Sequence, residues 1–138
     1  MNRNEIGDKV LEVADRFGSR NRQQLVQLEK RFREYSPEEL FYGLYKVFLL
    51  DGENYFERQQ LAGRLLYKIR PKLHLDLRKI VWQCLETYNP SVEELPWYLA
   101  SLCKKERVVL VLAELKNGTL TEKESISIKT FEFWLKRI

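Results

Sequence analysis

The chain has 138 residues, of which 44% are hydrophobic and 32% are charged, and its formal net charge is +4. This composition excludes a disordered chain and predicts one folded domain with an apolar core and a charged exterior. Six glycines and four prolines leave little material for the turns of an all-β fold. The N-terminus lacks the apolar region of a signal peptide, and no apolar run is long enough to cross a bilayer. We therefore expect a cytoplasmic protein without membrane contact.

Apolar residues recur at helical spacing from the start of the chain. They predict a first helix over residues 5–17 and a second over residues 20–35. Gly18 and Ser19 separate the two, since glycine is the usual residue at a helix end. Residues 1–35 are therefore expected to form an N-terminal helical hairpin.

A short phrase occurs twice and predicts the starts of two further helices. It reads SPEEL at residues 36–40 and SVEEL at residues 91–95. In each copy the serine hydroxyl can cap a backbone N–H, and the glutamate three residues later can reach back to complete a capping box. Two similar starts about 55 residues apart, at residues 36 and 91, indicate a duplicated helical unit.

The same periodicity predicts the remaining helices in chain order. A third helix follows Ser36, and others are expected over residues 54–69 and 73–88, after Ser91, around the apolar run 108–113, and after Thr121. The run 108–113 is apolar on all sides, which predicts a central helix surrounded by the others. Thr121 with Glu124 forms another expected capping box. The apolar residues that follow, up to Ile138, predict a docked C-terminus.

About eight short antiparallel helices joined by short links are typical of a bundle or an α-solenoid. Besides the repeated phrase, Glu57-Arg58 with Leu61 and Leu66 matches Glu106-Arg107 with Leu110 and Leu115. Over about residues 36–138 the chain therefore resembles helical-repeat proteins of the HEAT and armadillo type. The resemblance implies an all-α, right-handed helical stack in a single domain, 1–138, with related units at 36–90 and 91–138. The alternative is a compact irregular helical bundle.

Residues for catalysis or metal binding are sparse. The single histidine, His74, and the cysteines Cys84 and Cys103 lack the spacing of a metal site, and no glycine-rich phosphate loop is present. Both cysteines fall on apolar helical faces and are expected to be free, buried thiols. We therefore expect no enzyme activity, cofactor or metal. The enzymatic alternative is an acid–base site that uses His74 or a glutamate.

Aromatic residues supply the first candidate binding site. Trp and Tyr at half-exposed places are typical anchors of protein interfaces. Four such residues lie on the helices that follow the two serine phrases, where not every ring can turn inward. The expected anchors are Tyr42, Tyr45, Trp97 and Tyr98.

A basic segment supplies the second candidate site. Between residues 58 and 79 there are seven cations and one acid, Asp76. The expected basic patch comprises Arg58, Arg64, Lys68, Arg70, Lys72, Arg78 and Lys79. If these cations lie side by side, they can bind phosphates or an acidic partner.

These observations predict a non-enzymatic protein–protein interaction module, such as an adaptor, a regulator or a stoichiometric inhibitor of the immunity-protein type. Its partner would be another protein, bound by the aromatic anchors and steered by the cations. The alternative is a nucleic-acid-binding protein that uses the basic helical face. Exposed aromatic residues also allow a homo-oligomer.

Overall fold

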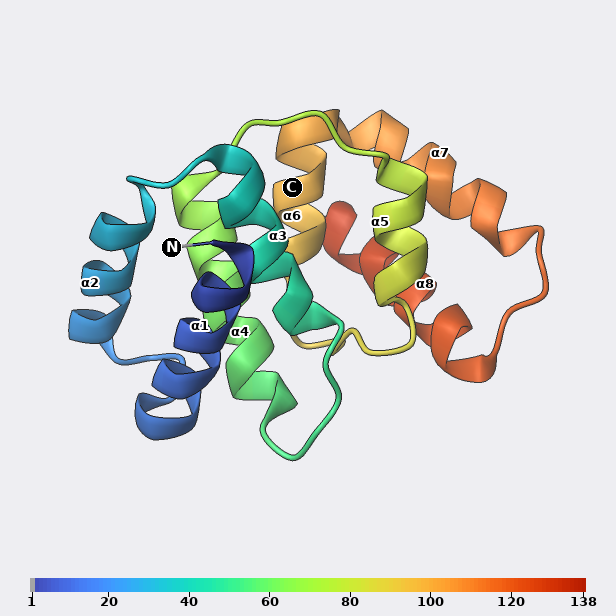
Figure 1. The fold of residues 1–138 in the computed structure, drawn as a ribbon. Helices are drawn as coiled ribbons and strands as arrows, with labels where there is room; N and C mark the ends of the chain where they lie inside the picture. Colours follow the sequence, from blue (N-terminus) through green and yellow to red (C-terminus); the bar gives the residue numbers. More distant parts are fainter. Residues whose placement is uncertain (1) are drawn as a thin grey trace.

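The computed structural model describes residues 2–138, which contain eight α-helices and no strand (Figure 1). The expected all-α fold is therefore confirmed. No helix in residues 2–138 has the length and apolar character needed to span a membrane. The helices are α1 Arg3–Phe17, α2 Arg22–Phe32, α3 Pro37–Phe48, α4 Tyr55–Ile69, α5 Leu77–Cys84, α6 Glu94–Cys103, α7 Lys105–Lys116 and α8 Glu122–Leu135.

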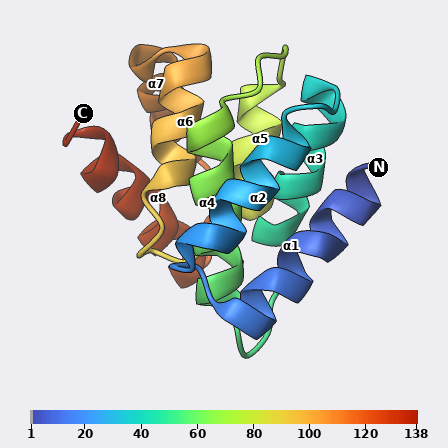
Figure 2. The ribbon, with the colours of Figure 1, turned by 90° about the vertical axis from the view of Figure 1, so that its left-hand side faces the viewer.

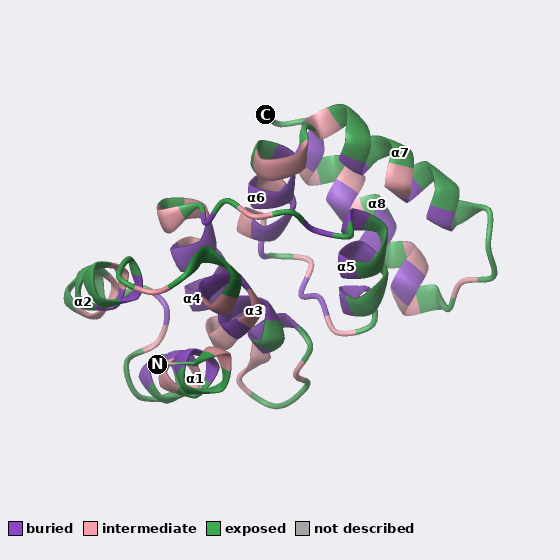
Figure 3. Cartoon of the chain, turned by 45° about the horizontal axis from the view of Figure 1, so that its top comes forward, coloured by how far each residue is buried: buried purple, intermediate pink, exposed green. Residues whose placement is uncertain are grey.

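The helices lie in two rows. In the odd row, α1 packs against α3 and α5 packs against α7; in the even row, α2 packs against α4, α4 against α6, and α6 against α8. Seen from above, α1, α3 and α5 follow one another beside α2, α4 and α6 (Figure 3). Contacts across the rows join α1 to α2 and α4, α3 to α4, and α7 to α6 and α8. Helices α3 and α5 make fewer contacts and are joined by the hydrogen bond from the Tyr45 hydroxyl to the Ile80 carbonyl.

Short polar side chains cap the starts of five helices, because each accepts a hydrogen bond from a backbone N–H that has no partner within the helix. The Thr121–Glu124 capping box is complete, which confirms that prediction. The five caps are Asn2, Asn21, Ser36, Asp76 and Thr121.

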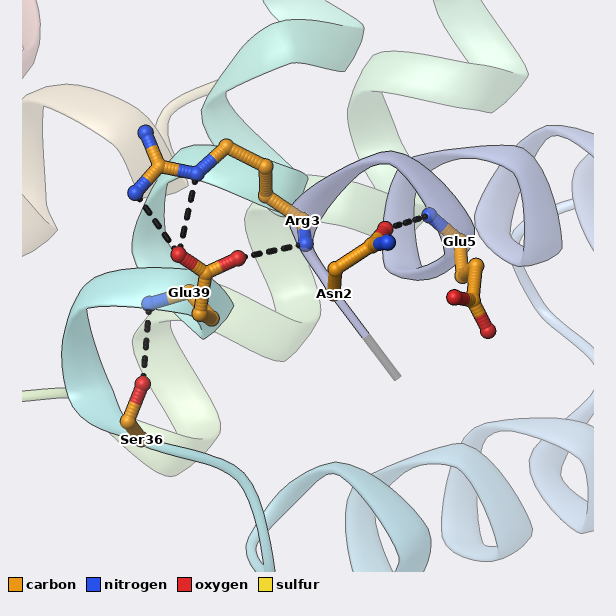
Figure 4. A network of polar contacts seen from close by, with 5 residues as sticks. All are labelled: Asn2, Arg3, Glu5, Ser36 and Glu39. Carbon is orange, nitrogen blue, oxygen red and sulfur yellow. Dashed lines mark hydrogen bonds and ion pairs between the residues drawn. The ribbon is translucent and has the colours of Figure 1, made fainter.

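The first serine phrase forms only half of its expected capping box. Ser36 accepts a hydrogen bond from the Glu39 N–H at 3.2 Å, but the Glu39 carboxylate turns to α1 instead of Ser36 (Figure 4). It accepts from the backbone N–H of Arg3 at 2.7 Å and from Nε and Nη2 of Arg3 at 3.1 and 2.7 Å. Glu39 therefore joins the starts of α1 and α3.

The second serine phrase does not cap a helix, so this prediction is wrong. Helix α6 begins at Glu94, and its N-cap residue, Glu93, makes no side-chain cap. The Ser91 N–H donates instead to Oδ1 of Asn89, in a turn that also buries Val92. Moreover, the helices that follow the two phrases lie in different rows, α3 in the odd row and α6 in the even row. The expected units at 36–90 and 91–138 therefore start at positions that are not equivalent.

Helix α5 is much shorter than the predicted helix over residues 73–88. Residues 71–76 are not helical, and Pro71 and Leu75 are buried as the chain passes from α4 to α5 (Figure 1). Beyond α5, the buried Gln59 side chain holds the connection to α6. Its Nε2 donates to the Thr87 carbonyl at 2.7 Å, and its Oε1 accepts from the Asn89 N–H at 2.8 Å. Hydrogen bonds from Gln59 thus satisfy backbone groups of a segment that was expected to be the end of a helix and its stop.

The buried apolar residues of all eight helices form one contiguous core. Helix α7 is not central, contrary to the prediction, because it ends the odd row and packs on one side only. Val108, Leu112 and Leu115 are buried, whereas Val109 and Leu110 are 43% and 60% exposed. The C-terminus is docked through Leu135, while Ile138 is exposed.

Candidate binding surface on the even row

Four aromatic residues from three successive even-row helices meet in what we term the aromatic strip: Tyr67 of α4, Trp97 of α6, and Trp134 and Phe133 of α8. Successive ring centroids are 5.8, 6.1 and 4.9 Å apart. Tyr67, Trp97 and Trp134 are half-buried, and Phe133 is 44% exposed. The strip is therefore a continuous, partly exposed aromatic surface across three helices.

Hydrogen bonds fix both indole rings of the strip. Nε1 of Trp97 donates to the Trp134 carbonyl at 3.0 Å, and Nε1 of Trp134 donates to the Pro90 carbonyl at 2.9 Å. Because both indole N–H groups are hydrogen-bonded within the protein, the ring faces are the parts that a partner can contact. A rigid ring loses little conformational entropy when it binds.

An arginine covers each end of the strip. Cζ of Arg70 lies 4.2 Å from the Tyr67 ring centroid, and Cζ of Arg137 lies 3.5 Å from that of Phe133. Both distances are within the range of cation–π attraction. The strip therefore combines aromatic faces with positive charge at both ends.

Beside Tyr67 the surface is hollowed between α2, α4 and α6. This basic hollow has a volume of about 560 Å³ and is lined by Leu25, Arg64, Tyr67, Lys68, Arg70 and Glu94. Three cations thus face one carboxylate. Burial raises the pKa of Glu94, although Gln60 Nε2 donates to both of its oxygens at 2.9 Å, which lowers it. The hollow is therefore positively charged.

A second hollow lies at the other end of the strip. This apolar hollow has a volume of about 360 Å³ and is lined by Pro90, Ile126, Lys129, Thr130, Phe133 and Trp134. Phe133 and Trp134 belong to both the strip and this hollow, just as Tyr67 belongs to both the strip and the basic hollow. The two hollows and the strip therefore form one continuous surface.

Two of the four predicted anchors are in the wrong environment to meet a partner. Tyr45 and Tyr98 are 3% and 1% exposed, and their hydroxyls donate to the carbonyls of Ile80 at 2.6 Å and Pro71 at 2.5 Å. Burial raises the pKa of both phenols. Each hydroxyl finds a partner on a neighbouring segment, so the whole ring can be buried.

The other two predicted anchors lie on different rows. Tyr42 is half-buried on α3, where Cζ of Arg3 lies 4.8 Å from its ring centroid. Trp97 alone of the four belongs to the strip. The sequence reasoning missed Tyr67, Phe133 and Trp134, because their proximity depends on which helices are neighbours and no spacing along the chain encodes it.

The predicted basic patch is divided among several places. Arg64, Lys68 and Arg70 line the basic hollow, and Lys72 lines an adjoining hollow with Arg70. The remaining three, Arg58, Arg78 and Lys79, lie elsewhere. Arg78 and Lys79 line a groove between α5 and α7, where Arg78 binds Glu114 at 2.7 Å.

Arg58 is engaged in a structural ion pair at the far end of α4. Its Nη2 and Nε lie 2.6 and 2.8 Å from the two oxygens of Asp15 on α1. Hydrogen bonds from this guanidinium lower the pKa of Asp15 to about 2. Arg58 therefore serves the packing of α1 against α4 and belongs to neither hollow.

The residues considered for catalysis are scattered. His74 is exposed in the segment between α4 and α5, and residues 2–138 contain no group of three metal-ligating side chains. Cys84 and Cys103 are both free, buried and half-buried respectively, and burial raises the pKa of the Cys84 thiol to about 12. A thiol in that state is a poor nucleophile at neutral pH.

No protein-family model, no curated protein and no solved structure matches this chain. Its class is therefore defined by its own features: an all-α protein of two helix rows, with an aromatic strip flanked by a basic and an apolar hollow.

Proposed function

We propose that this protein is a non-enzymatic protein-interaction module that binds a segment of a partner protein across the aromatic strip. The observation that carries the proposal is the meeting of Tyr67, Trp97 and Trp134 from three helices on one partly exposed surface. Tyrosine, tryptophan and arginine contribute most of the binding energy in protein interfaces. Here all three types lie together, and hydrogen bonds hold both indole rings in place.

We also propose that the two rows form a single-domain, right-handed stack of the HEAT or armadillo kind. The packing of α1 on α3, of α5 on α7, and of α2, α4, α6 and α8 in succession supports it, since helix pairs stacked side by side produce that pattern. The repeating unit in this proposal is the helix pair, in place of the three-helix units first expected from residues 36–90 and 91–138. Such stacks present extended surfaces to their ligands.

The role that follows is that of an adaptor, a regulator or a stoichiometric inhibitor, which acts by occupying a surface of its partner. We propose a cytoplasmic location, which two free thiols suit. A homo-oligomer formed through the strip is a special case, in which the partner is a second copy.

The test is selection of binders from a phage library of random twelve-residue peptides, followed by affinity measurement on the selected peptides. The double variant Tyr67→Ser/Phe133→Ser removes the two outer rings of the strip. We expect it to bind selected peptides at least about tenfold more weakly than the wild type does. The matched control is Phe17→Ser/Trp82→Ser, which removes two exposed rings of the odd row and should change affinity less than about twofold.

Two outcomes contradict the proposal. One is a selection that yields no peptide whose binding depends on the strip. The other is binding of a labelled single-stranded DNA, at about 0.15 M salt, more tightly than any selected peptide, with loss in Arg64→Ala/Lys68→Ala. The second result would make the protein a nucleic-acid binder. Circular dichroism and urea unfolding of each variant establish that it is folded.

A further inference from the structure

We infer that the basic hollow receives acidic side chains of the partner segment while the apolar hollow receives a large apolar side chain of the same segment. The inference rests on the proposed function and adds the chemistry and direction of the bound segment. The occupant is thus a stretch of partner protein that is acidic at one end and apolar at the other.

The cations of the basic hollow are only partly neutralised, by the charge of Glu94 near Arg64 and by Glu29 near Lys68. Nε of Arg64 is buried and has no hydrogen-bond partner among residues 2–138. Lys68 has a long contact, 3.9 Å, with Glu29, and Nε of Arg70 donates to the Tyr67 carbonyl of its own helix. Positive charge in the hollow is therefore available to an incoming carboxylate.

Several arginines elsewhere in the chain already bind a carboxylate of the protein. Arg3, Arg58 and Arg78 each bind a carboxylate of the protein, at 2.7, 2.6 and 2.7 Å. Neither Arg64 nor Arg70 forms an ion pair within residues 2–138. Other arginines of residues 2–138 also lack an ion pair, among them Arg16, Arg22 and Arg107, but Arg64 is the arginine with a buried side-chain nitrogen that has no hydrogen-bond partner there. A carboxylate of a partner bound beside the strip would satisfy it.

Arg70 has an unusual backbone conformation for an arginine. This residue follows α4 with φ +53° and ψ +62°, in the left-handed region that favours glycine. An arginine there strains the backbone, and its side chain is held over the Tyr67 ring at the edge of the hollow. Backbone strain of this kind is found at binding sites. It also serves helix ends, as at Lys104 between α6 and α7, so Arg70 points to a ligand only through the place of its side chain at the hollow.

The strip is short enough for one peptide to cover. Its three ring-to-ring steps of 5.8, 6.1 and 4.9 Å span at most the length of about five residues of extended chain. The hollows lie at opposite ends of this path and have opposite character, since one is lined by three cations and the other mainly by apolar groups. A short peptide can therefore reach both hollows at once, in one direction.

The experiment uses the peptide selection on the full chain. The wild-type pool is expected to be enriched in Asp and Glu about five positions from a Trp, Phe or Leu. The pool selected on Arg64→Ala/Lys68→Ala/Arg70→Gly should lose the acidic enrichment and keep the apolar one. The control variant Arg16→Ala/Lys46→Ala/Lys79→Ala removes the same charge from the odd row and should keep both.

A double-mutant cycle with the tightest selected peptide separates contact from general charge. Changing its acidic residues to Asn and Gln should weaken wild-type binding at least about tenfold and leave the triple variant's binding unchanged. The variant Lys68→Ala/Arg70→Gly, altered at two exposed positions only, provides the same test should the triple variant fold poorly. A selected pool without acidic residues, or additive effects in the cycle, would overturn the inference.

The failure of this inference is distinguishable from failure of the proposed function. If acid-free peptides bind and Tyr67→Ser/Phe133→Ser still abolishes their binding, the hollow assignment is wrong and the strip remains the interaction site. If no selected peptide depends on the strip, both fail.

Discussion

Gly43 of α3 lies so close to Ile6 of α1 that a Cβ atom at residue 43 would come within 2.8 Å of the Ile6 Cβ and Cγ2. The same Cβ would lie 2.8 Å from the Arg3 carbonyl oxygen. Contacts this short are not tolerated. The Arg3 carbonyl oxygen belongs to the backbone and the Ile6 Cβ is bonded to it, so neither atom can move aside easily. The missing side chain at Gly43 therefore permits α1 and α3 to approach this closely.

Gly43→Ala is expected to destabilise the protein by about 1–2 kcal/mol. Alanine gains about 1 kcal/mol over glycine within a helix, but overpacking costs roughly 1–3 kcal/mol and is severe here. Urea unfolding measures the change. Gly118→Ala is the control, because a Cβ there would make only an ordinary contact at 3.6 Å. A more stable Gly43→Ala variant would contradict the packing of α1 on α3.

Gln59→Leu is expected to lower the free energy of unfolding by about 2–4 kcal/mol. The leucine fits the size of the buried side chain but leaves the Thr87 carbonyl and the Asn89 N–H without their partner. The midpoint of urea unfolding should fall at an unchanged slope. Gln83→Leu changes an exposed glutamine on α5 and should have little effect. Equal midpoints for the two variants would disprove the role of Gln59.

Asp15→Asn is expected to remove a pH-dependent part of the stability. The folded-state pKa of Asp15 is about 2, below its ordinary value of 3.8, so its pairing with Arg58 stabilises the protein above about pH 4 and is lost as the pH falls toward 2. Because the carboxylate is 42% exposed, the contribution is at most about 1 kcal/mol.

The measurement is the free energy of unfolding of wild type and Asp15→Asn between pH 2 and 7. The difference should be constant above about pH 4 and shrink toward pH 2. Asp8→Asn removes another carboxylate from α1 and serves as the control. A difference that grows on acidification would contradict the ion pair.

Arg70→Gly is expected to maintain or raise stability while it weakens peptide binding. Glycine adopts the left-handed conformation without strain, which raises the free energy of unfolding by roughly 1–2 kcal/mol. It also gives the unfolded chain more freedom, which lowers the free energy of unfolding by roughly 0.4–1 kcal/mol. Thermal unfolding and peptide affinity are measured on the same preparation. Stability that falls together with affinity would mean that Arg70 is mainly structural.

Much of the fold could be predicted from local patterns. The third helix was expected to follow Ser36, and α3 begins at Pro37 with Ser36 as its N-cap. The Thr121–Glu124 capping box was also correct. These features depend on residues within one or two helical turns of each other, so the chain itself contains the necessary information.

The candidate site was much less predictable. Trp97 and Tyr98 are adjacent in sequence, yet one lies in the strip and the other is buried against Pro71. Arg64 and Arg58 lie on one helix, yet a carboxylate from α1 pairs with Arg58 only. These differences arise from side chains of distant segments, which helical periodicity does not identify.

By itself the sequence determined an all-α protein with an amphipathic third helix, several capped starts and more cations than acids. The tertiary structure alone decided that Glu39 binds Arg3 instead of closing its own capping box. It also decided that Gln59 bonds to Thr87 and Asn89 where a longer helix was expected, and that Tyr67, Trp97 and Trp134 meet. Helix starts and apolar faces follow from interactions between near neighbours along the chain. Which faces meet depends on the packing of whole helices, where a single missing Cβ, as at Gly43, sets how closely two of them approach.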